Sequence, residues 1–119
     1  MQGNLFVMQL FIEGTLTGDV TRRFSLPVGA TLIGANAGCD NTTSFILDVG
    51  TAADADAYID GETVTGAAAT TTDFAASDLV DGEPMHIAAN TEIVITIDYD
   101  GGAGTDGAGI NVDLFVREG

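Results

Sequence analysis

Apolar and polar residues alternate along much of the chain with a period of two. In residues 92–99 every second side chain is large and apolar, beginning with Ile93, and residues 110–117 repeat this alternation, beginning with Ile110. Such alternation, rich in β-branched residues, is typical of a strand with one buried face. The same reasoning predicts strands over 5–16, 19–28 and 44–49, and shorter strands near 61–66, 70–74 and 85–88.

Turn signals separate these segments. Asp-Gly dipeptides stand at 60–61, 81–82, 100–101 and 106–107, and both residue types tolerate the backbone of tight turns. One short helix is predicted over 51–58, because Thr51 and Asp54 form an N-cap signal. The predicted fold is all-β: one antiparallel β-sandwich or jelly roll of about eight strands, with at most one or two short helical turns, formed by residues 1–119 as a single domain.

The first predicted strand is apolar on both faces. Phe6 and Met8 begin one face and Leu5 and Val7 begin the other, yet a sandwich core needs only one face of each sheet. Val94 and Phe115 likewise lie on strand faces whose other residues are mostly polar. Apolar residues left over after the core is filled indicate a contact with another subunit. Alternatively, the first strand is buried on both sides within one chain. The apolar interface candidates are Leu5, Val7, Phe11, Val94 and Phe115.

The charge of the chain is one-sided. Eighteen acidic residues face three arginines, giving a net charge of −15. Such a chain repels nucleic acid, and its self-repulsion is relieved by salt. An acidic partner group is expected for each of the scarce cations, which makes Arg22, Arg23 and Arg117 further interface candidates. A halophilic or marine source and a simple compositional bias both explain the absence of lysine.

A glycine-rich segment, Asp98 to Gly109, contains Gly-Gly-Ala-Gly-Thr-Asp, which matches the start of the calcium repeat of parallel β-helices. The repeat occurs once, whereas those calcium sites need stacked copies. We therefore predict a hairpin tip between two neighbouring strands and no cofactor. Asp98, Asp100 and Asp106 stay as weak candidates for a Ca²⁺ site.

Catalytic constellations are scarce. Cys39 and His86 are the sole cysteine and histidine, which is too few for a zinc site, and the serines stand in no nucleophile motif. We expect no enzymatic activity. The N-terminus lacks signal-peptide features, and no apolar run is long enough to span a bilayer, so we expect no membrane partner and synthesis in the cytoplasm.

Three stretches carry a resemblance: "RRFSLPVGATLIGANAG", "SFILDVGTAADADAYIDG" and "MHIAANTEIVITIDYDGGAGTDGAGINVDLFVREG". Their style of strand and turn, notably Asp-Val-Gly-Thr before an acidic, alanine-rich segment, resembles small head decoration (cement) proteins of tailed viruses. The resemblance spans roughly residues 20–119 and includes no invariant chemical motif. It implies a β-sandwich on the outer capsid surface, bound to the major capsid protein, in homotrimers or similar clusters, and without catalysis.

Two functions follow as hypotheses. The first is a structural virion protein that stabilises a capsid shell by bridging its subunits. The alternative is a receptor- or carbohydrate-binding head of a viral fibre or spike with a weak Ca²⁺ loop.

Overall fold

Strands make up most of the structure. The computed structural model describes residues 4–40, 43–66, 70–98 and 107–118. Within these residues the elements are β1 (Leu5–Thr15), β2 (Val20–Ser25), β3 (Ala30–Gly38), β4 (Ser44–Gly50), β5 (Ile59–Thr65), β6 (Thr72–Phe74), the 3-10 helix η1 (Ala76–Asp78), β7 (Met85–Ile87), β8 (Glu92–Asp98) and β9 (Ala108–Glu118).

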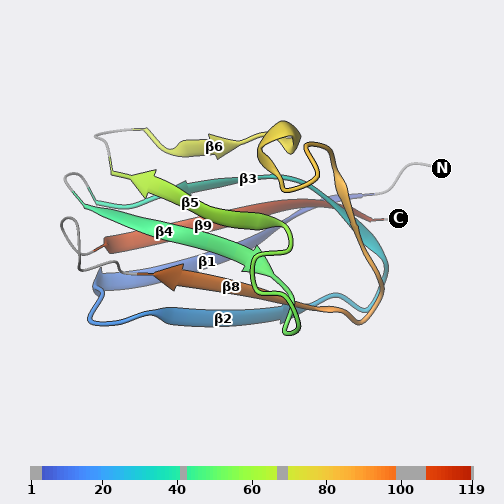
Figure 1. Ribbon diagram of the computed structural model, residues 1–119, viewed down its shortest axis with the longest axis horizontal. Helices are drawn as coiled ribbons and strands as arrows, with labels where there is room; N and C mark the ends of the chain where they lie inside the picture. Colours follow the sequence, from blue (N-terminus) through green and yellow to red (C-terminus); the bar gives the residue numbers. More distant parts are fainter. Residues whose placement is uncertain (1–3, 41–42, 67–69, 99–106, 119) are drawn as a thin grey trace.

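The strands form two sheets packed face to face (Figure 1). Sheet A has the order β1-β9-β3-β6, and β7 also pairs with β3. Sheet B has the order β2-β8-β4-β5, and it lies in front in Figure 1. Every pairing is antiparallel. The predicted antiparallel β-sandwich is therefore confirmed.

The core lies between the sheets, and the alternating segments supply it. The inward residues of β8 and β9 are fully buried: Ile93, Ile95, Ile97, Ile110, Val112, Leu114 and Val116. Phe45, Leu47 and Val49 of β4, the neighbour of β8 in sheet B, belong to the same core. Burying such side chains contributes roughly 1.5–3 kcal/mol each, so the period-two pattern sets which face of each strand turns inward.

Strand β3 was missed by the sequence pattern, although it is central in sheet A. Its sequence, ATLIGANAG, is rich in small residues. A Cβ on Gly34 would lie 2.7 Å from the main-chain oxygen of Phe74 in β6, closer than real side chains approach. The small residues of β3 therefore allow neighbouring strands to pack closely. They do not produce the alternation of large apolar and polar residues by which a strand is predicted.

The hairpin predicted for residues 98–109 is wrong. Strand β8 ends at Asp98 in sheet B, and β9 begins at Ala108 in sheet A. Both sides of each strand are already paired, β8 by β2 and β4, and β9 by β1 and β3. The segment is therefore a connection between sheets and not a turn between neighbours. Asp100 and Asp106 lie outside the described residues.

The helix predicted over 51–58 is also not formed. The cap signal is real, because the amide of Asp54 donates to Thr51 Oγ1 at 3.1 Å. The chain then turns back, and the Tyr58 amide donates to the carbonyl of Val49 at 2.8 Å. Tyr58 and Ile59 must return to the core, where both are buried, so the segment closes as turns between β4 and β5. The described residues contain one short helical element, η1, at Ala76–Asp78.

Candidate functional site

The outer face of sheet A carries exposed apolar side chains along its edge strand. Leu5, Val7 and Phe11 of β1 expose 60%, 45% and 67% of their surface. The register places Phe115 of β9 directly beside Val7, and Phe115 is half-buried on the same face. We call Leu5, Val7, Phe11 and Phe115 the β1 strip. Four of the five apolar interface candidates thus lie together on one face.

The opposite face of β1 explains why this surplus exists. Phe6, Met8 and Ile12 pack against the core, and Leu10 belongs to it. The inward residues already fill the space between the sheets, so the outward residues have no place inside the chain. Large apolar groups gathered on one exposed face indicate a surface that meets another molecule.

Val94, the fifth apolar candidate, was expected to be exposed but is buried. It points outward from sheet B, opposite Gly50, yet exposes only 5% of its surface. A Cβ on Gly50 would lie 2.1 Å from the carbonyl oxygen of Asp54, so residues 51–57 fold down onto this part of the sheet. Val94 is therefore buried under a loop of its own chain and offers little surface to a partner.

The arginines occupy three different environments. Arg23 pairs with Glu92 on the outer face of sheet B, with Nη1 and Oε1 2.8 Å apart and both side chains well exposed; such a pair contributes about 0–1 kcal/mol. Arg22 is exposed on edge strand β2, where its Nη1 donates to the carbonyl of Thr21. Arg117 is exposed on the outer face of sheet A, between Leu5 of β1 and Thr31 of β3. Of the three, Arg117 lies beside the β1 strip.

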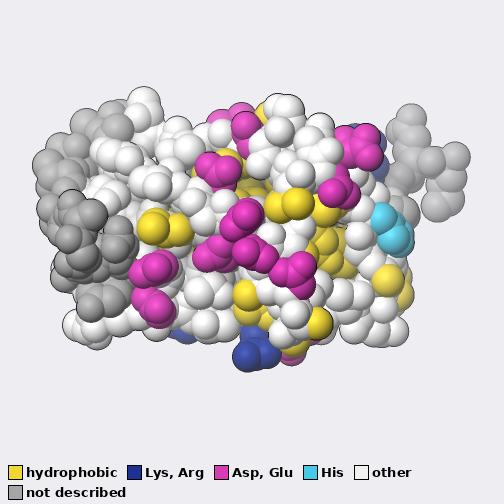
Figure 2. Space-filling model, viewed as in Figure 1, with side chains coloured by type: hydrophobic (Ala, Val, Ile, Leu, Met, Phe, Trp, Pro, Cys, Tyr) yellow, Lys and Arg dark blue, Asp and Glu magenta, His cyan; other side chains and the backbone are white. Residues whose placement is uncertain are grey.

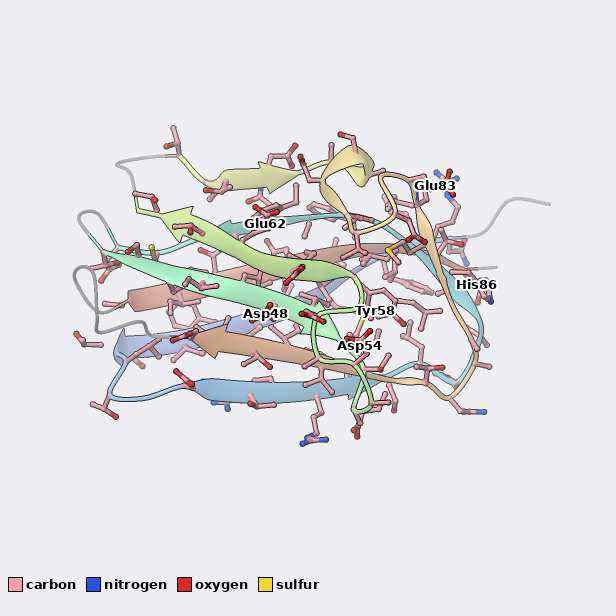
Figure 3. The ribbon with its side chains drawn as sticks, viewed as in Figure 1. Asp48, Asp54, Tyr58, Glu62, Glu83 and His86 are labelled. Carbon is pink, nitrogen blue, oxygen red and sulfur yellow. The ribbon has the colours of Figure 1, made fainter. Side chains whose placement is uncertain are left out.

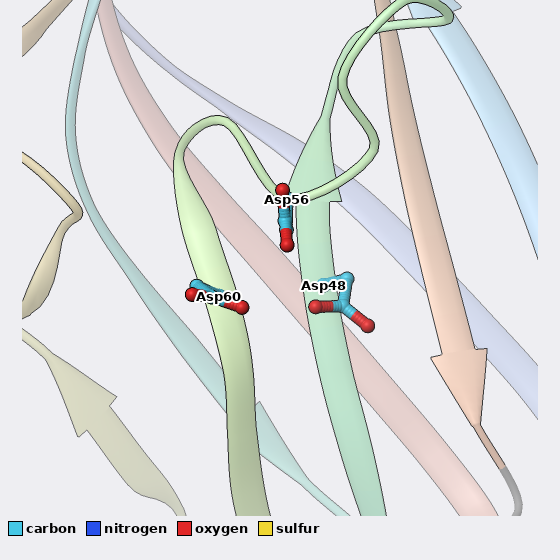
Figure 4. A group of neighbouring side chains, drawn as sticks. All are labelled: Asp48, Asp56 and Asp60. Carbon is cyan, nitrogen blue, oxygen red and sulfur yellow. The ribbon is translucent and has the colours of Figure 1, made fainter.

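Acidic side chains gather on the outer face of sheet B (Figure 2). Carboxylate oxygens of Asp48 in β4, Asp56 in the loop and Asp60 in β5 all lie within 4.8 Å of one another (Figure 4). Asp56 and Asp60 are close in the sequence, whereas Asp48 comes close because the chain returns from the loop to pair β5 with β4. Asp48 Oδ1 also accepts a hydrogen bond of 2.7 Å from the Gly61 amide.

Asp54 belongs to the same acidic surface (Figure 3). A hydrogen bond with the carboxyl group of Asp56 raises the pKa of Asp54 above its usual value, and desolvation and the negative charge of Asp56 act in the same direction. Carboxylates of this kind can bind a divalent cation, but Ca²⁺ takes about six to eight oxygen ligands, and the three clustered aspartates supply only part of such a set.

The remaining chemical candidates are far apart. His86 is exposed in β7, opposite Thr31 at the start of β3 (Figure 3). Cys39 follows the other end of β3, and its Sγ donates to the carbonyl of Thr43 at 3.3 Å. The length of β3, about 3.3 Å per residue, separates them, so they form no common metal site. Asp98 lies at the end of β8, partly exposed.

Among the described residues, no helix is long and apolar enough to cross a membrane. No protein-family model matches the sequence, and no curated protein matches it. The fold is similar to that of a chain in the solved structure titled "Cyanophage Pam1 capsid asymmetric unit", with a TM-score of 0.63 and 23% sequence identity over 99% of this chain and 87% of that chain. At this identity the likeness is one of fold, and it covers nearly the whole of both chains.

Proposed function

We propose that this protein is a structural component of a virion, a decoration subunit that binds the outer surface of the capsid shell and stabilises it. The observation that carries the proposal is the β1 strip: an exposed apolar surface on an otherwise acidic, sandwich-shaped subunit. The fold shared with a chain of a cyanophage capsid asymmetric unit supports the same role, as does the resemblance of the sequence to decoration proteins.

The two faces of the sandwich suit a subunit with one bound side and one solvated side. Sheet A would turn the β1 strip towards the shell, where burial of each large side chain contributes roughly 1.5–3 kcal/mol. Sheet B would turn its acids outward, where they keep the decorated particle soluble. Arg117, beside the strip, is the cation best placed to meet a carboxylate of the major capsid protein.

The resemblance to decoration proteins favours homotrimers, formed where capsid subunits meet. The charge of the chain, −15, opposes binding to nucleic acid. The role requires no catalysis and no cofactor, because bridging neighbouring capsid subunits is itself what stabilises a shell.

The experiment is a decoration assay on capsid particles that lack this protein. Purified wild-type protein is added, and copies bound per particle and the melting temperature of the shell are measured. Phe11→Asp should bind at least tenfold more weakly, because a charge replaces the most exposed apolar side chain of the β1 strip.

Val80→Asp is the matched control, because Val80 is 52% exposed and lies outside the strip. It should decorate particles as the wild type does. If Phe11→Asp and Phe115→Asp both decorate particles normally, the strip is not the capsid-binding surface and the proposal loses its main support. Trimers are checked by the mass of protein released from particles.

A further inference from the structure

Strand β1 leaves one side of its main chain unpaired. It is the end strand of sheet A, with β9 on one side and no strand of the described residues on the other. The Glu118 amide donates to the carbonyl of Asn4 at 2.9 Å. In an antiparallel pair, successive residues turn their hydrogen-bonding groups to alternate sides. The even-numbered residues of β1 therefore bond to β9, and Leu5, Val7, Gln9 and Phe11 direct theirs to the open edge.

The other edges of the sandwich are protected against pairing. Edge strand β2 carries Arg22 and Arg23, and β5 carries Asp60 and Glu62. Strands β6 and β7 have three residues each. Charges and short length are the means by which natural sheets avoid edge-to-edge association. Residues 5–12 of β1, LFVMQLFI, contain no charge, no proline and no glycine, so this edge lacks such protection.

We propose that β1 pairs with β1 of a second copy of this chain, antiparallel and across a two-fold axis, so that the two sheets A become one continuous sheet. In the register we assign, Met8 lies opposite Met8 of the partner subunit. Leu5 then lies opposite the partner's Phe11, and Val7 opposite the partner's Gln9. The unpaired edge of β1 is thus covered by β1 of the second copy.

Two constraints select this register. Residues that face each other across a strand pair share one face of the sheet, so outward residues must meet outward residues. The backbone of β1 is also irregular between Ile12 and Thr15, where Gly14 has a φ of +82°, so the regular part ends at Ile12. Centring the pair on Met8 uses the regular part alone, and it supplies hydrogen-bond partners to Leu5, Val7, Gln9 and Phe11 together.

Charge favours a second copy at this edge over contact between copies elsewhere. Each copy carries −15, so close approach of two copies is opposed wherever like charges face each other, as at the Asp60 and Glu62 edge of β5. Residues 5–12 bring no charge to the contact. The pairing also places Leu5 and the partner's Phe11 side by side, which are exposed by 60% and 67% in the single chain.

The pairing goes beyond the proposed function and is tested without particles. A two-fold contact between edge strands is separate from a three-fold cluster on a shell, and it also joins two β1 strips on one side of a continuous sheet. Failure of decoration leaves the pairing intact, and failure of the pairing leaves decoration intact.

Cysteine cross-linking tests the register. Met8→Cys is made in a Cys39→Ser background and exposed to a mild oxidant. Across a two-fold axis at a non-hydrogen-bonded pair the two Cα atoms lie about 4.5 Å apart, within the roughly 4.4–6.8 Å that a disulfide spans. A disulfide-linked dimer should form in most of the protein.

Phe11→Cys in the same background is the matched control. Its side chain is exposed, but in this register the two introduced thiols are about 20 Å apart, so little dimer should form. If Met8→Cys cross-links no more than Phe11→Cys, the proposed pairing is wrong.

A second variant tests the main chain. Val7→Pro removes an amide that points to the open edge and leaves the bonds to β9 in place. The native mass of the protein in 1 M salt should fall by half, whereas Val7→Ala, which keeps the amide, should retain the wild-type mass. An unchanged mass for folded Val7→Pro, or a monomeric wild type at all concentrations, would overturn the proposal. If Val7→Pro fails to fold, the cross-linking result decides.

Discussion

The two outer faces of the sandwich differ in whether their outward apolar residues are exposed or covered. On sheet A, Leu5 and Phe11 stand on an edge strand with no covering segment among the described residues, and they are exposed. On sheet B, Val94 points outward from a central strand, but residues 51–57 close over it. An apolar residue on the outer face is therefore a partner contact only if its own chain leaves it uncovered.

The same loop also separates the faces by charge. It brings Asp56 towards Asp48 and Asp60, so covering Val94 and building the acidic surface are two effects of one segment. On sheet A the long, regular edge of β1 stays open, with Arg117 beside it. One face thus has its outward apolar residue covered within the chain, whereas the other leaves Leu5, Val7 and Phe11 exposed.

The largest expected effect comes from placing a charge under the loop. Val94→Asp should lower the free energy of unfolding by about 3 kcal/mol or more, because a carboxylate is buried without a partner. Phe11→Asp should change it by no more than about 0.5 kcal/mol in the monomer, because the site is exposed. Urea unfolding curves of both variants measure the difference. Equal losses would mean that the two faces do not differ as described.

A smaller loss is expected from filling the space between Gly50 and the loop. Gly50→Ala should destabilise the fold by about 1–3 kcal/mol, the range for overpacking, because the new methyl group meets the main chain of Asp54 and Ala55. Gly18→Ala is the control, since nothing lies within 4 Å of a Cβ there. Thermal unfolding of the two variants gives the comparison, and a neutral Gly50→Ala would show that the loop is easily displaced from sheet B.

Removing one clustered charge should stabilise the protein slightly at low salt. Asp60→Asn relieves repulsion with Asp48 and Asp56, and we expect a gain of about 0.2–1 kcal/mol that shrinks as salt rises from 0.1 to 1 M and the Debye length falls from about 10 to about 3 Å. Asp73→Asn, an exposed position in β6, is the matched control. Repeating the measurement with CaCl₂ and NaCl at equal ionic strength separates cation binding from screening. Equal gains in the free energy of unfolding for both variants would contradict the repulsion proposed among Asp48, Asp56 and Asp60.

The smallest effect is expected in the titration of Asp54. Its pKa is raised from the usual 3.8, chiefly by the hydrogen bond with Asp56. Because the folded state then holds this proton more tightly than the unfolded state, the stabilising contribution is complete below about pH 3.8 and is lost as the pH rises through the folded pKa. Asp56→Ala should return the pKa of Asp54 towards its ordinary value. Carboxyl chemical shifts followed by NMR across pH 2–7 test this, and an unmoved Asp54 titration would remove Asp56 as the cause.

Strands with a large-apolar alternation were predictable, and those built from small residues were not. The buried faces of β8 and β9 follow directly from the sequence, because each alternation is local and each buried residue is large. Strand β3 was not predicted because it contains small residues such as Gly34, which allow the close approach of β6 but do not form an alternation of large apolar side chains. The acidic group was only half predictable, since Asp48 is distant in sequence and joins Asp56 and Asp60 through strand pairing.

The sequence by itself determined the fold class, the inward face of each alternating strand and the apolar surplus in residues 5–12, because each of these depends on a pattern within a few residues. Only the tertiary structure decided which strands pair, that residues 98–109 join two different sheets, and that Val94 is covered while Leu5, Val7 and Phe11 are exposed. These outcomes depend on contacts between segments far apart in the chain, which no local alternation records.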